Sequence, residues 1–303
     1  MKSRKKIWSI IAVCCIVVGG IVSITAATVA GFDFSEFNST QYEEKVYTVA
    51  DSFENIELAA DWENVCLLPS PNKDCQVVCS ENDNLNYTVK VEDNTLKIER
   101  HEHSQWYEHI GAFWFSSSPG IAIYLPEQEY ETLSITTSSG DVTVPKEFAF
   151  STVSAKTASG NLGIAASVSQ YLKLQASSGD IAAQKFVGHS VEIQTTSGGI
   201  AVEDCTAESI QLVSTSGDIT LTNTVAKKKM NLQASSGNIA LSKCDAPDIA
   251  LQTTSGDVGG SLLSGKDFSV QTSSGDAILP EDSSKTETCS IITVSGNIII
   301  TIQ

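Results

Sequence analysis

The dipeptide Ser-Gly, followed by Asp, Asn or Gly, recurs nine times between residues 139 and 297 of this 303-residue chain. Successive glycines are 19 to 21 residues apart, and they are Gly140, Gly160, Gly179, Gly198, Gly217, Gly237, Gly256, Gly275 and Gly296. Self-similarity at a fixed period of this size is typical of proteins in which each repeat packs only against its neighbours. This repeat constrains the fold more than any other feature of the chain.

Each Ser-Gly pair lies between two short segments in which apolar and polar residues alternate. Around Gly217, Ile210 and Leu212 precede the glycine, and Ile219 and Leu221 follow it. A period of two indicates β-strands, whereas a helix would place apolar residues at i, i+3 and i+4. The residue three positions before each glycine is small, so the inward side chains shrink towards the bend.

A pair of short strands cannot bury its apolar side chains alone, so the repeats must stack. We predict an all-β solenoid of nine rungs of 19–20 residues over residues 131–303. A spacing of about 4.8 Å per rung gives a rod of roughly 40 Å. We expect each glycine to adopt a positive φ at a sharp corner, and the Asp or Asn after it to bond the turn backbone.

The residues that follow the glycines form a ladder: Asp141, Asn161, Asp180, Gly199, Asp218, Asn238, Asp257, Asp276 and Asn297. Stacked carboxylates could hold calcium, but the calcium β-roll needs a nine-residue repeat rich in glycine and aspartate. The interspersed uncharged residues also weaken like-charge repulsion. We interpret the ladder as turn chemistry and expect no cofactor.

The predicted outward positions are mostly uncharged. Four residues before the glycine the chain has Gln175, Gln194, Gln233, Gln252 and Gln271, interrupted by Val213. Outward residues after the glycine are mainly Thr, Ala and Gly. Stacked amides and hydroxyls can bond along a rod and stabilise it. The same face could instead dock a glycan, an envelope protein or a second copy, so the five glutamines are candidate binding residues.

The N-terminal end has the pattern of a membrane anchor. A basic stretch, Lys2–Lys6, precedes a run without charge from Ile7 to Phe32. Such a run is long enough to span a bilayer, and the basic residues place the N-terminus in the cytoplasm. We predict a cytoplasmic tip and a single transmembrane helix in the cell membrane over residues 1–32, a linker over 33–44 and an extracellular remainder. A signal peptide cleaved within residues 25–30 is the alternative.

The part beyond the predicted anchor is strongly acidic. Removing the four basic residues of the tip from the 19 Lys and Arg leaves 15 against 36 Asp and Glu, a net charge of −21. An acidic exterior argues against nucleic acid or anionic lipid as a direct ligand. It is typical of a soluble surface that resists non-specific association.

Residues 45–130 keep a β pattern without the strict repeat, and we interpret them as degenerate first rungs that cap the rod. Asp93-Asn94 marks a tight hairpin. A second hairpin turning at residues 71–74 would place Cys66 opposite Cys79, with Cys75 on the same face. One extracellular disulfide is then possible, and buried free thiols are the alternative.

Residues 101–115 are unusual within the cap. They hold three of the four histidines and five aromatic residues, Trp106, Tyr107, Phe113, Trp114 and Phe115. Histidine and glutamate at this density could bind a transition metal, but the ligand spacing is not regular and we predict no metal site. The aromatic residues either plug the end of the rod or form an exposed tip that contacts a partner or a membrane. We treat these five as candidate binding residues.

The segments Gly120–Pro126 and Leu133–Val142, with the later Ser-Gly-Asp/Asn turns, resemble a bacterial β-strand-repeat family known as "putative adhesin", a domain of unknown function. The resemblance covers residues 45–303 and implies an envelope-associated β-solenoid, often linked with cell-envelope stress systems. It supplies no catalytic residues. The aromatic segment departs from the polar loop that is usual there.

Two functions from different classes remain. The first is a membrane-anchored extracellular interaction protein, adhesin-like or stress-associated and non-catalytic, that uses its flat faces or its aromatic tip. The second is a polysaccharide-acting enzyme, which needs acidic and basic side chains that converge on a groove. Because the outward positions are mostly Gln, Ser, Thr, Ala and Gly, we predict that the chain is not an enzyme.

Overall fold

The computed structural model describes residues 42–102, 120–281 and 286–303, which belong to one compact unit. The nine Ser-Gly repeats form nine strand pairs: β8 (Glu129–Thr137) and β9 (Val142–Val144), β10 (Ala149–Thr157) and β11 (Leu162–Ile164), β12 (Ser167–Ser178) and β13 (Ile181–Gln184), β14 (Val187–Ser197) and β15 (Ile200–Glu203), β16 (Thr206–Ser214) and β17 (Ile219–Thr222), β18 (Val225–Ala234) and β19 (Ile239–Cys244), β20 (Asp248–Gln252) and β21 (Val258–Leu262), β22 (Asp267–Ser274) and β23 (Ala277–Ile278), and β24 (Thr288–Ser295) and β25 (Ile298–Ile302).

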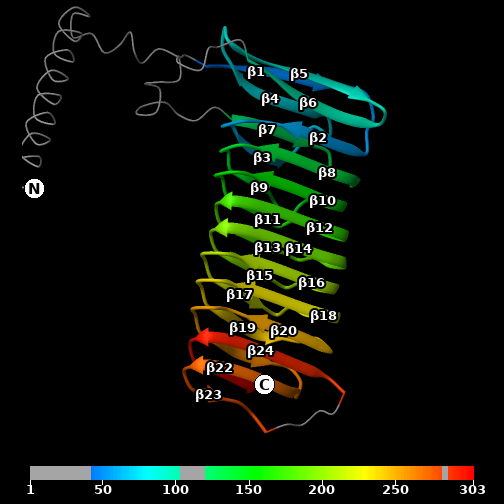
Figure 1. Ribbon diagram of the computed structural model, residues 1–303. Coiled ribbons are helices and arrows are strands. Elements are labelled where there is room, and N and C mark those ends of the chain that lie inside the picture. Colours follow the sequence, from blue (N-terminus) through cyan, green and yellow to red (C-terminus); the bar gives the residue numbers. More distant parts are fainter. Residues whose placement is uncertain (1–41, 103–119, 282–285) are drawn as a thin grey trace, which may run out of the picture. The chain divides into compact units, whose positions relative to one another are not determined.

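Seven more strands precede the repeats: β1 (Glu43–Val49), β2 (Asn55–Ala59), β3 (Asn64–Pro69), β4 (Cys75–Glu81), β5 (Leu85–Glu92), β6 (Thr95–Glu102) and β7 (Gly120–Leu125). All of these strands belong to two sheets that face each other along the stack (Figure 1). Sheet A has the order β1-β4-β7-β3-β9-β11-β13-β15-β17-β19-β21-β25-β23, and sheet B has the order β22-β24-β20-β18-β16-β14-β12-β10-β8-β2-β6-β5.

Equivalent residues of neighbouring repeats pair in parallel and in register, so each inward side chain packs on its counterparts. Ile193 pairs with Leu212, and Leu212 pairs with Leu232. All three side chains are completely buried, and burying a side chain of this size stabilises a fold by about 1.5–3 kcal/mol. The predicted all-β solenoid and its inward rows are confirmed.

The corner glycines serve close packing rather than a positive φ, so our expectation of left-handed glycines at these corners was wrong. Of the nine, only Gly275 has a positive φ, 145°. A Cβ atom added at Gly198 would lie 2.0 Å from the carbonyl oxygen of Gly179, and at all nine corners the corresponding distance is 1.8–2.2 Å. Successive corners therefore stack backbone on backbone, at a separation that leaves no room for a side chain.

The small residue three positions before the glycine completes this corner. Thr195 Oγ1 donates a hydrogen bond to the carbonyl oxygen of Gly179 at 3.1 Å, and Ser214 Oγ donates to that of Gly198 at 3.0 Å. Both hydroxyl residues are buried. A buried carbonyl group and a buried hydroxyl thus satisfy each other, which explains the Thr and Ser side chains inside an otherwise apolar stack.

The left-handed residues occur at the opposite bend, where each rung returns to the next. The equivalent residues there have φ between 49° and 59°, and they are Lys185, Asp204, Asn223 and Lys243. No glycine marks this bend. The sequence pattern therefore gave no signal for it.

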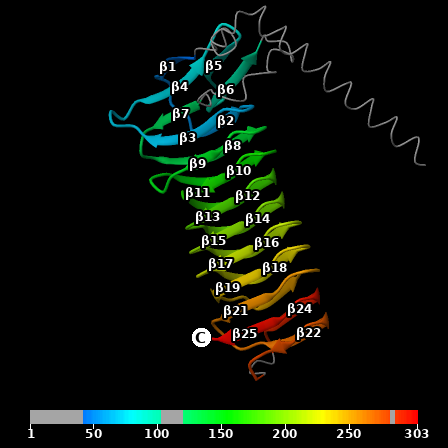
Figure 2. The ribbon, with the colours of Figure 1, turned by 90° about the vertical axis from the view of Figure 1, so that its left-hand side faces the viewer.

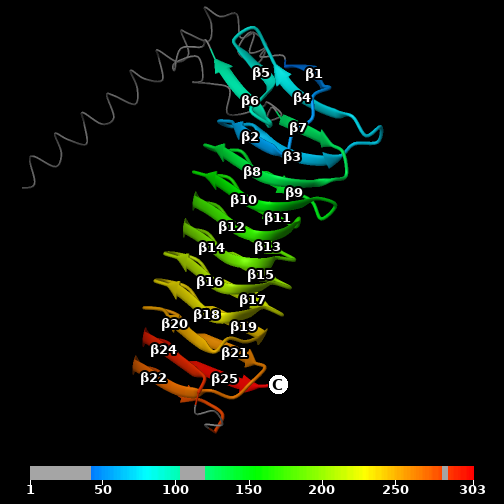
Figure 3. The same cartoon turned by 90° about the vertical axis from the view of Figure 1, so that its right-hand side faces the viewer.

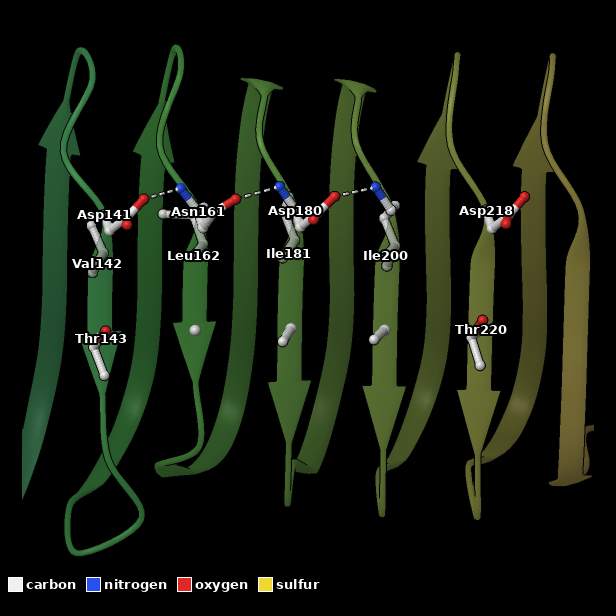
Figure 4. A pocket seen from close by; sticks show the side chains of 14 residues that line it. Asp141, Val142, Thr143, Asn161, Leu162, Asp180, Ile181, Ile200, Asp218 and Thr220 are labelled. Atoms are coloured by element: carbon white, nitrogen blue, oxygen red, sulfur yellow. Dashed lines mark hydrogen bonds between the residues drawn. The ribbon is translucent and has the colours of Figure 1, made fainter.

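Except for Asp276 on the last rung, the Asp and Asn side chains of the ladder accept the backbone N–H of the neighbouring rung, rather than bonding only their own turn. Asp141 Oδ1 accepts from the N–H of Asn161 at 2.7 Å, Asn161 Oδ1 accepts from Asp180 at 2.9 Å, and Asp180 Oδ1 accepts from Gly199 at 2.7 Å (Figure 4). Gly199 has no side chain to continue the series to Asp218. The ladder is thus a chain of inter-rung hydrogen bonds with one gap.

The last two repeats stack in the reverse of their sequence order. The strand pair β24–β25 lies against β20–β21, and β22–β23 forms the end of both sheets (Figure 3). Ile298–Gln303 is therefore not the end of the stack, although it is the end of the chain. The row of outward glutamines is also interrupted, because Ile292 pairs with both Gln252 and Gln271.

In this order, aspartates alternate strictly with uncharged residues along the ladder. The backbone N–H of Asn297 donates to Asp257 Oδ1 at 2.6 Å, and Asn297 Oδ1 accepts from the N–H of Asp276 at 3.1 Å. In sequence order Asp276 would have followed Asp257 directly. In spatial order every aspartate of the ladder is separated from the next by Asn or Gly, so carboxylates lie two rungs, or about 10 Å, apart.

The N-terminal end combines two rungs with antiparallel strands. β2 and β3 pair in parallel with β8 and β9, and β6 and β7 pair in parallel with β2 and β3 on their other side. β4 and β5 then add in antiparallel orientation to β7 and β6, and β1 adds to β4 (Figure 2). The interpretation as degenerate rungs holds for the two parallel pairs only.

The two hairpins expected in this region have different outcomes. Asp93 and Asn94 connect antiparallel β5 and β6 with φ of 49° and 60°, as predicted for a tight turn. The hairpin at residues 71–74 was wrong, because β7 lies between β3 and β4. Cys66 and Cys79 are therefore two strands apart, and both are free thiols.

The adjacent glycines Gly198 and Gly199 allow a matched test of the corner packing. We expect Gly198→Ala to destabilise the fold by about 3 kcal/mol, because its Cβ would overlap a backbone carbonyl. Gly199→Ala should change stability little, since its Cβ would lie 3.6 Å from the nearest atoms. Urea unfolding followed by circular dichroism measures both. Equal stabilities of the two variants would contradict this account of the corner.

The gap at Gly199 tests the ladder. Gly199→Asn should stabilise the protein by about 1 kcal/mol, because the new side chain can accept the N–H of Asp218 as in every other rung. Gly199→Asp has the same shape but creates three successive carboxylates, so it should stabilise less, and the difference should shrink as salt is added. Thermal unfolding at low and high ionic strength provides the measurement; identical behaviour of Asn and Asp would refute the importance of alternation.

Candidate binding surfaces

The glutamines predicted as binding residues lie on the outer face of sheet B. Gln194, Gln233, Gln252 and Gln271 are exposed, and Gln175 is partly exposed. Gln175 pairs in register with Gln194, and Gln233 pairs with Gln252. Val213 and Ile292 separate these pairs from each other and from Gln271. The structure thus has two glutamine pairs and one separate glutamine, and their role in binding stays a prediction.

Sheet B is not free of charge across its whole width. Lys173 Nζ lies 3.0 Å from Glu192 Oε1, and these two residues are two positions before Gln175 and Gln194 on the same face. Lys228 also contacts Glu208. Only a strip next to the Ser-Gly corner is uncharged, and it begins at Gln175, because Lys156 pairs with Gln175 in the same row. This strip is narrower than the face that we expected.

The aromatic candidates Trp106, Tyr107, Phe113, Trp114 and Phe115 lie outside the described residues. Neither arrangement that we proposed for them, a plug or an exposed tip, is addressed by the described part of the chain. Both stay predictions.

The outer face of sheet A has a groove beside the Asp/Asn ladder, with a volume of about 460 Å³ (Figure 4). Its floor is formed by the outward residues Gly163, Ala182 and Ala201, and Thr143 and Thr220 lie at its two ends. Ladder residues form one side. Small side chains on three successive rungs leave the groove open, and carboxylate and amide oxygens line its edge.

The carboxylates in this groove do not form an adjacent pair. Asp141, Asp180 and Asp218 all line it, but an uncharged ladder residue separates each from the next, so they are about 10 Å apart. Retaining glycosidases use carboxyl groups about 5–5.5 Å apart, and inverting ones about 6.5–9.5 Å. Among the described residues, no group of three or more His, Cys, Asp or Glu side chains is placed to hold a metal ion.

One buried cluster near the C-terminal end holds a serine beside a lysine, as a catalytic Ser-Lys pair does. Its groups instead form an ion-pair network. Lys266 is completely buried, and its Nζ lies 2.5 Å from Asp245 Oδ1, 2.5 Å from Glu287 Oε2 and 2.7 Å from Ser264 Oγ. The hydrogen bond from Lys266 lowers the pKa of Glu287. An ammonium group whose three hydrogens point at these acceptors is an ion-pair partner and not a base for the serine.

A second buried cluster lies at the other end of the stack. Arg100 donates from Nε to the buried Glu63 at 2.9 Å and from Nη1 to Glu102 at 2.7 Å, and its guanidinium lies 4.2 Å from the Trp62 ring centroid. Its Nη2 and the hydroxyl of Tyr87 are buried with no hydrogen-bond partner among the described residues, and burial raises the pKa of Tyr87. The cluster joins the first turn of β2–β3 to β6.

The described cysteines are not reactive centres. Burial raises the pKa of Cys75, Cys79 and Cys289 to about 12 and that of Cys205 to about 11. A thiol at such a pKa is protonated at neutral pH and is a poor nucleophile and metal ligand. The six described cysteines, which are free, therefore act as core residues or, for the partly exposed Cys66, as a surface thiol.

The fold and these surfaces define a β-solenoid whose exposed faces are rows of repeated side chains. The chain belongs to the family described as Toastrack DUF4097, which it matches over residues 53–301. This confirms the resemblance inferred from the Ser-Gly turns. A comparison with curated proteins finds no match.

Solved bacterial structures are similar to this chain at low sequence identity. A "putative lipid binding protein" from Parabacteroides distasonis is 19% identical with a TM-score of 0.51, and the similarity covers 87% of this chain and 98% of that one. A "putative adhesin" from Bacteroides fragilis is 17% identical over the same shares, with a TM-score of 0.45. Another "putative adhesin" from Parabacteroides distasonis is 13% identical over 86% and 98%, with a TM-score of 0.49.

The membrane segment expected at Ile7–Phe32 lies outside the described residues. Within the part of the chain that the structure describes, no helix has the length and apolar character needed to cross a bilayer.

Proposed function

We propose that this chain is a non-catalytic interaction protein of a bacterial cell envelope, held in the membrane by Ile7–Phe32 with the solenoid outside the cell. The basic stretch before the apolar run supports this orientation. The interaction role rests on the groove of sheet A, a concave surface that continues over several rungs of the described stack. An association with envelope stress responses is part of the same proposal, and it rests on the family resemblance alone.

The groove favours an extended, uncharged glycan as the ligand. Its floor of Gly163, Ala182 and Ala201 is flat and apolar, which matches the C–H face of a sugar ring. The ladder carboxylates use one oxygen for the next rung, and because they are exposed the other can accept hydrogen bonds from sugar hydroxyls. A polyanionic ligand would be repelled by a chain with net charge −17.

Catalysis on that glycan is disfavoured by the spacing of the same carboxylates. A glycosidase needs one carboxyl group as acid and a second as base or nucleophile, at a separation of about 5–5.5 Å or about 6.5–9.5 Å and in different environments. The three aspartates of the groove have equivalent positions in the repeat and make equivalent bonds. We therefore propose binding without cleavage.

Substitution along one row tests the groove. Ala201→Arg should fill the floor and abolish binding of envelope polysaccharide, because the long side chain occupies the space between two rungs. Ala240→Arg lies in the same outward row but outside the groove, so it should leave binding unchanged. Both residues are exposed and should not affect folding. Retention on immobilised envelope polysaccharides measures binding, and equal retention of both variants would exclude the groove.

Cell fractionation tests the anchor separately. The full-length chain should stay in the membrane fraction, and protease added to intact cells should digest the solenoid. Val17→Lys with Val18→Lys should release the chain from the membrane, because each lysine at the centre of a span costs about 2.5–3.5 kcal/mol. A shortened chain in the medium of cells that express the parent would instead support a cleaved signal peptide.

A further inference from the structure

Exposed apolar side chains gather at the C-terminal end of the stack. Of the nine large hydrophobic residues that are exposed in the described structure, six lie between residues 263 and 302: Leu263, Ile278, Ile292, Val294, Ile299 and Ile302. Ile278 is 61% exposed and pairs with Ile299, which is 49% exposed, on the outer face of sheet A. These side chains lie on both sheets around the last rungs, with Ile292 on sheet B and Ile278 on sheet A, and exposed apolar side chains gathered at one end of an acidic protein favour a contact there.

The end rung also leaves its inward residues incompletely covered. Phe268 and Val270 of β22 continue the inward rows, yet both are only partly buried. Their equivalents Ile249 and Leu251, inside the stack, are 0% and 1% exposed. Among the described residues, the inward rows are therefore less completely buried at this end than inside the stack.

The two ends of the stack differ in how their edge strands are protected. At the N-terminal end the edge strand β1 carries Glu43, Glu44 and Lys45, and the edge strand β5 carries Lys90 and Glu92. Charges on an edge strand prevent pairing with another strand. At the C-terminal end, β22 has one charge, at its first residue, and β23 has none. The strands next to them, β24 and β25, also have none.

We propose that this end is a self-association surface, at which a second copy of the chain docks tail to tail. Two edges are presented together at this end, since β22 ends sheet B and β23 ends sheet A (Figure 1). A single extended peptide could pair with one edge only. The end of another solenoid offers two edges at the same separation and continues both inward rows across the joint.

The charged N-terminal edges make a tail-to-head contact unfavourable, so the two tails pair with each other. A tail-to-tail contact is two-fold symmetric and closed, and it gives a dimer rather than a filament. This inference uses neither the groove of sheet A nor the aromatic segment. It can therefore fail or hold independently of the proposed function.

The mass of the full-length chain in solution is the first test. Purified in a mild detergent, the parent should have twice the chain mass of 32.3 kDa by light scattering corrected for detergent. Gln271→Lys with Ile278→Lys should weaken dimerisation at least tenfold, because each lysine occurs twice at the joint and faces a like charge. Val213→Lys with Ala240→Lys places the same charges in the same outward rows at mid-stack, outside the groove, and should leave the dimer intact.

Crosslinking identifies which ends meet. Ser273→Cys, exposed on β22, should give a covalent dimer with a short bismaleimide, whereas Ser177→Cys, exposed in the same row at mid-stack, should give no more than the parent. A parent that is monomeric at about 100 μM, where micromolar contacts are populated, would overturn the proposal. So would a dimer that the end-rung lysines leave unchanged, equal crosslinking at both serine positions, or a series of species larger than the dimer.

Discussion

The contact between one corner glycine and the carbonyl group of the next determines the geometry of this stack. Because the two backbones touch there, with room for no Cβ atom, every rung has the same spacing and the same register at the Ser-Gly edge. The inward rows then pack side chain on equivalent side chain. The ladder residue after each glycine lies close enough for its side chain to accept the amide hydrogen of the next rung. Both exposed faces consequently become rows of repeated chemistry.

The same spacing gives a reason for the order of the rungs. At a distance of about 4.8 Å between rungs, carboxylates on neighbouring rungs would repel each other. The reversed order of the last two repeats places Asn297 between Asp257 and Asp276. Each aspartate then has an uncharged neighbour on either side. The position of a rung in the stack thus depends on its polar edge as well as on its apolar core.

Much of the fold could be predicted because the two periods of the sequence correspond to two physical spacings. Alternation of apolar residues follows the pleat of a strand, and the 19-residue interval follows one rung, so residues such as Leu212 could be placed inside. The physical reason for a glycine at position 198 could not be predicted from the sequence, since a positive φ and a close backbone approach both require glycine. The order of the rungs in the stack could not be predicted either, because the inward apolar side chains of any rung can pack on those of any other. Small outward residues such as Ala201 suggested a bare surface, and only their register revealed a groove.

The two buried ion-pair networks occur where the order of rungs departs from the order of the chain. Arg100 on β6 reaches Glu63 only because β6–β7 stacks directly on β2–β3. Lys266, between β21 and β22, lies beside Glu287 because β22 pairs with β24, a contact that the sequence order of the repeats would also allow. A stacking order that separated β6–β7 from β2–β3 would instead leave the buried Glu63 without Arg100, at a cost of about 3–5 kcal/mol. Apolar rows that fit any neighbour hold the stack together, and at the N-terminal end a buried ion pair that fits one neighbour specifies the order.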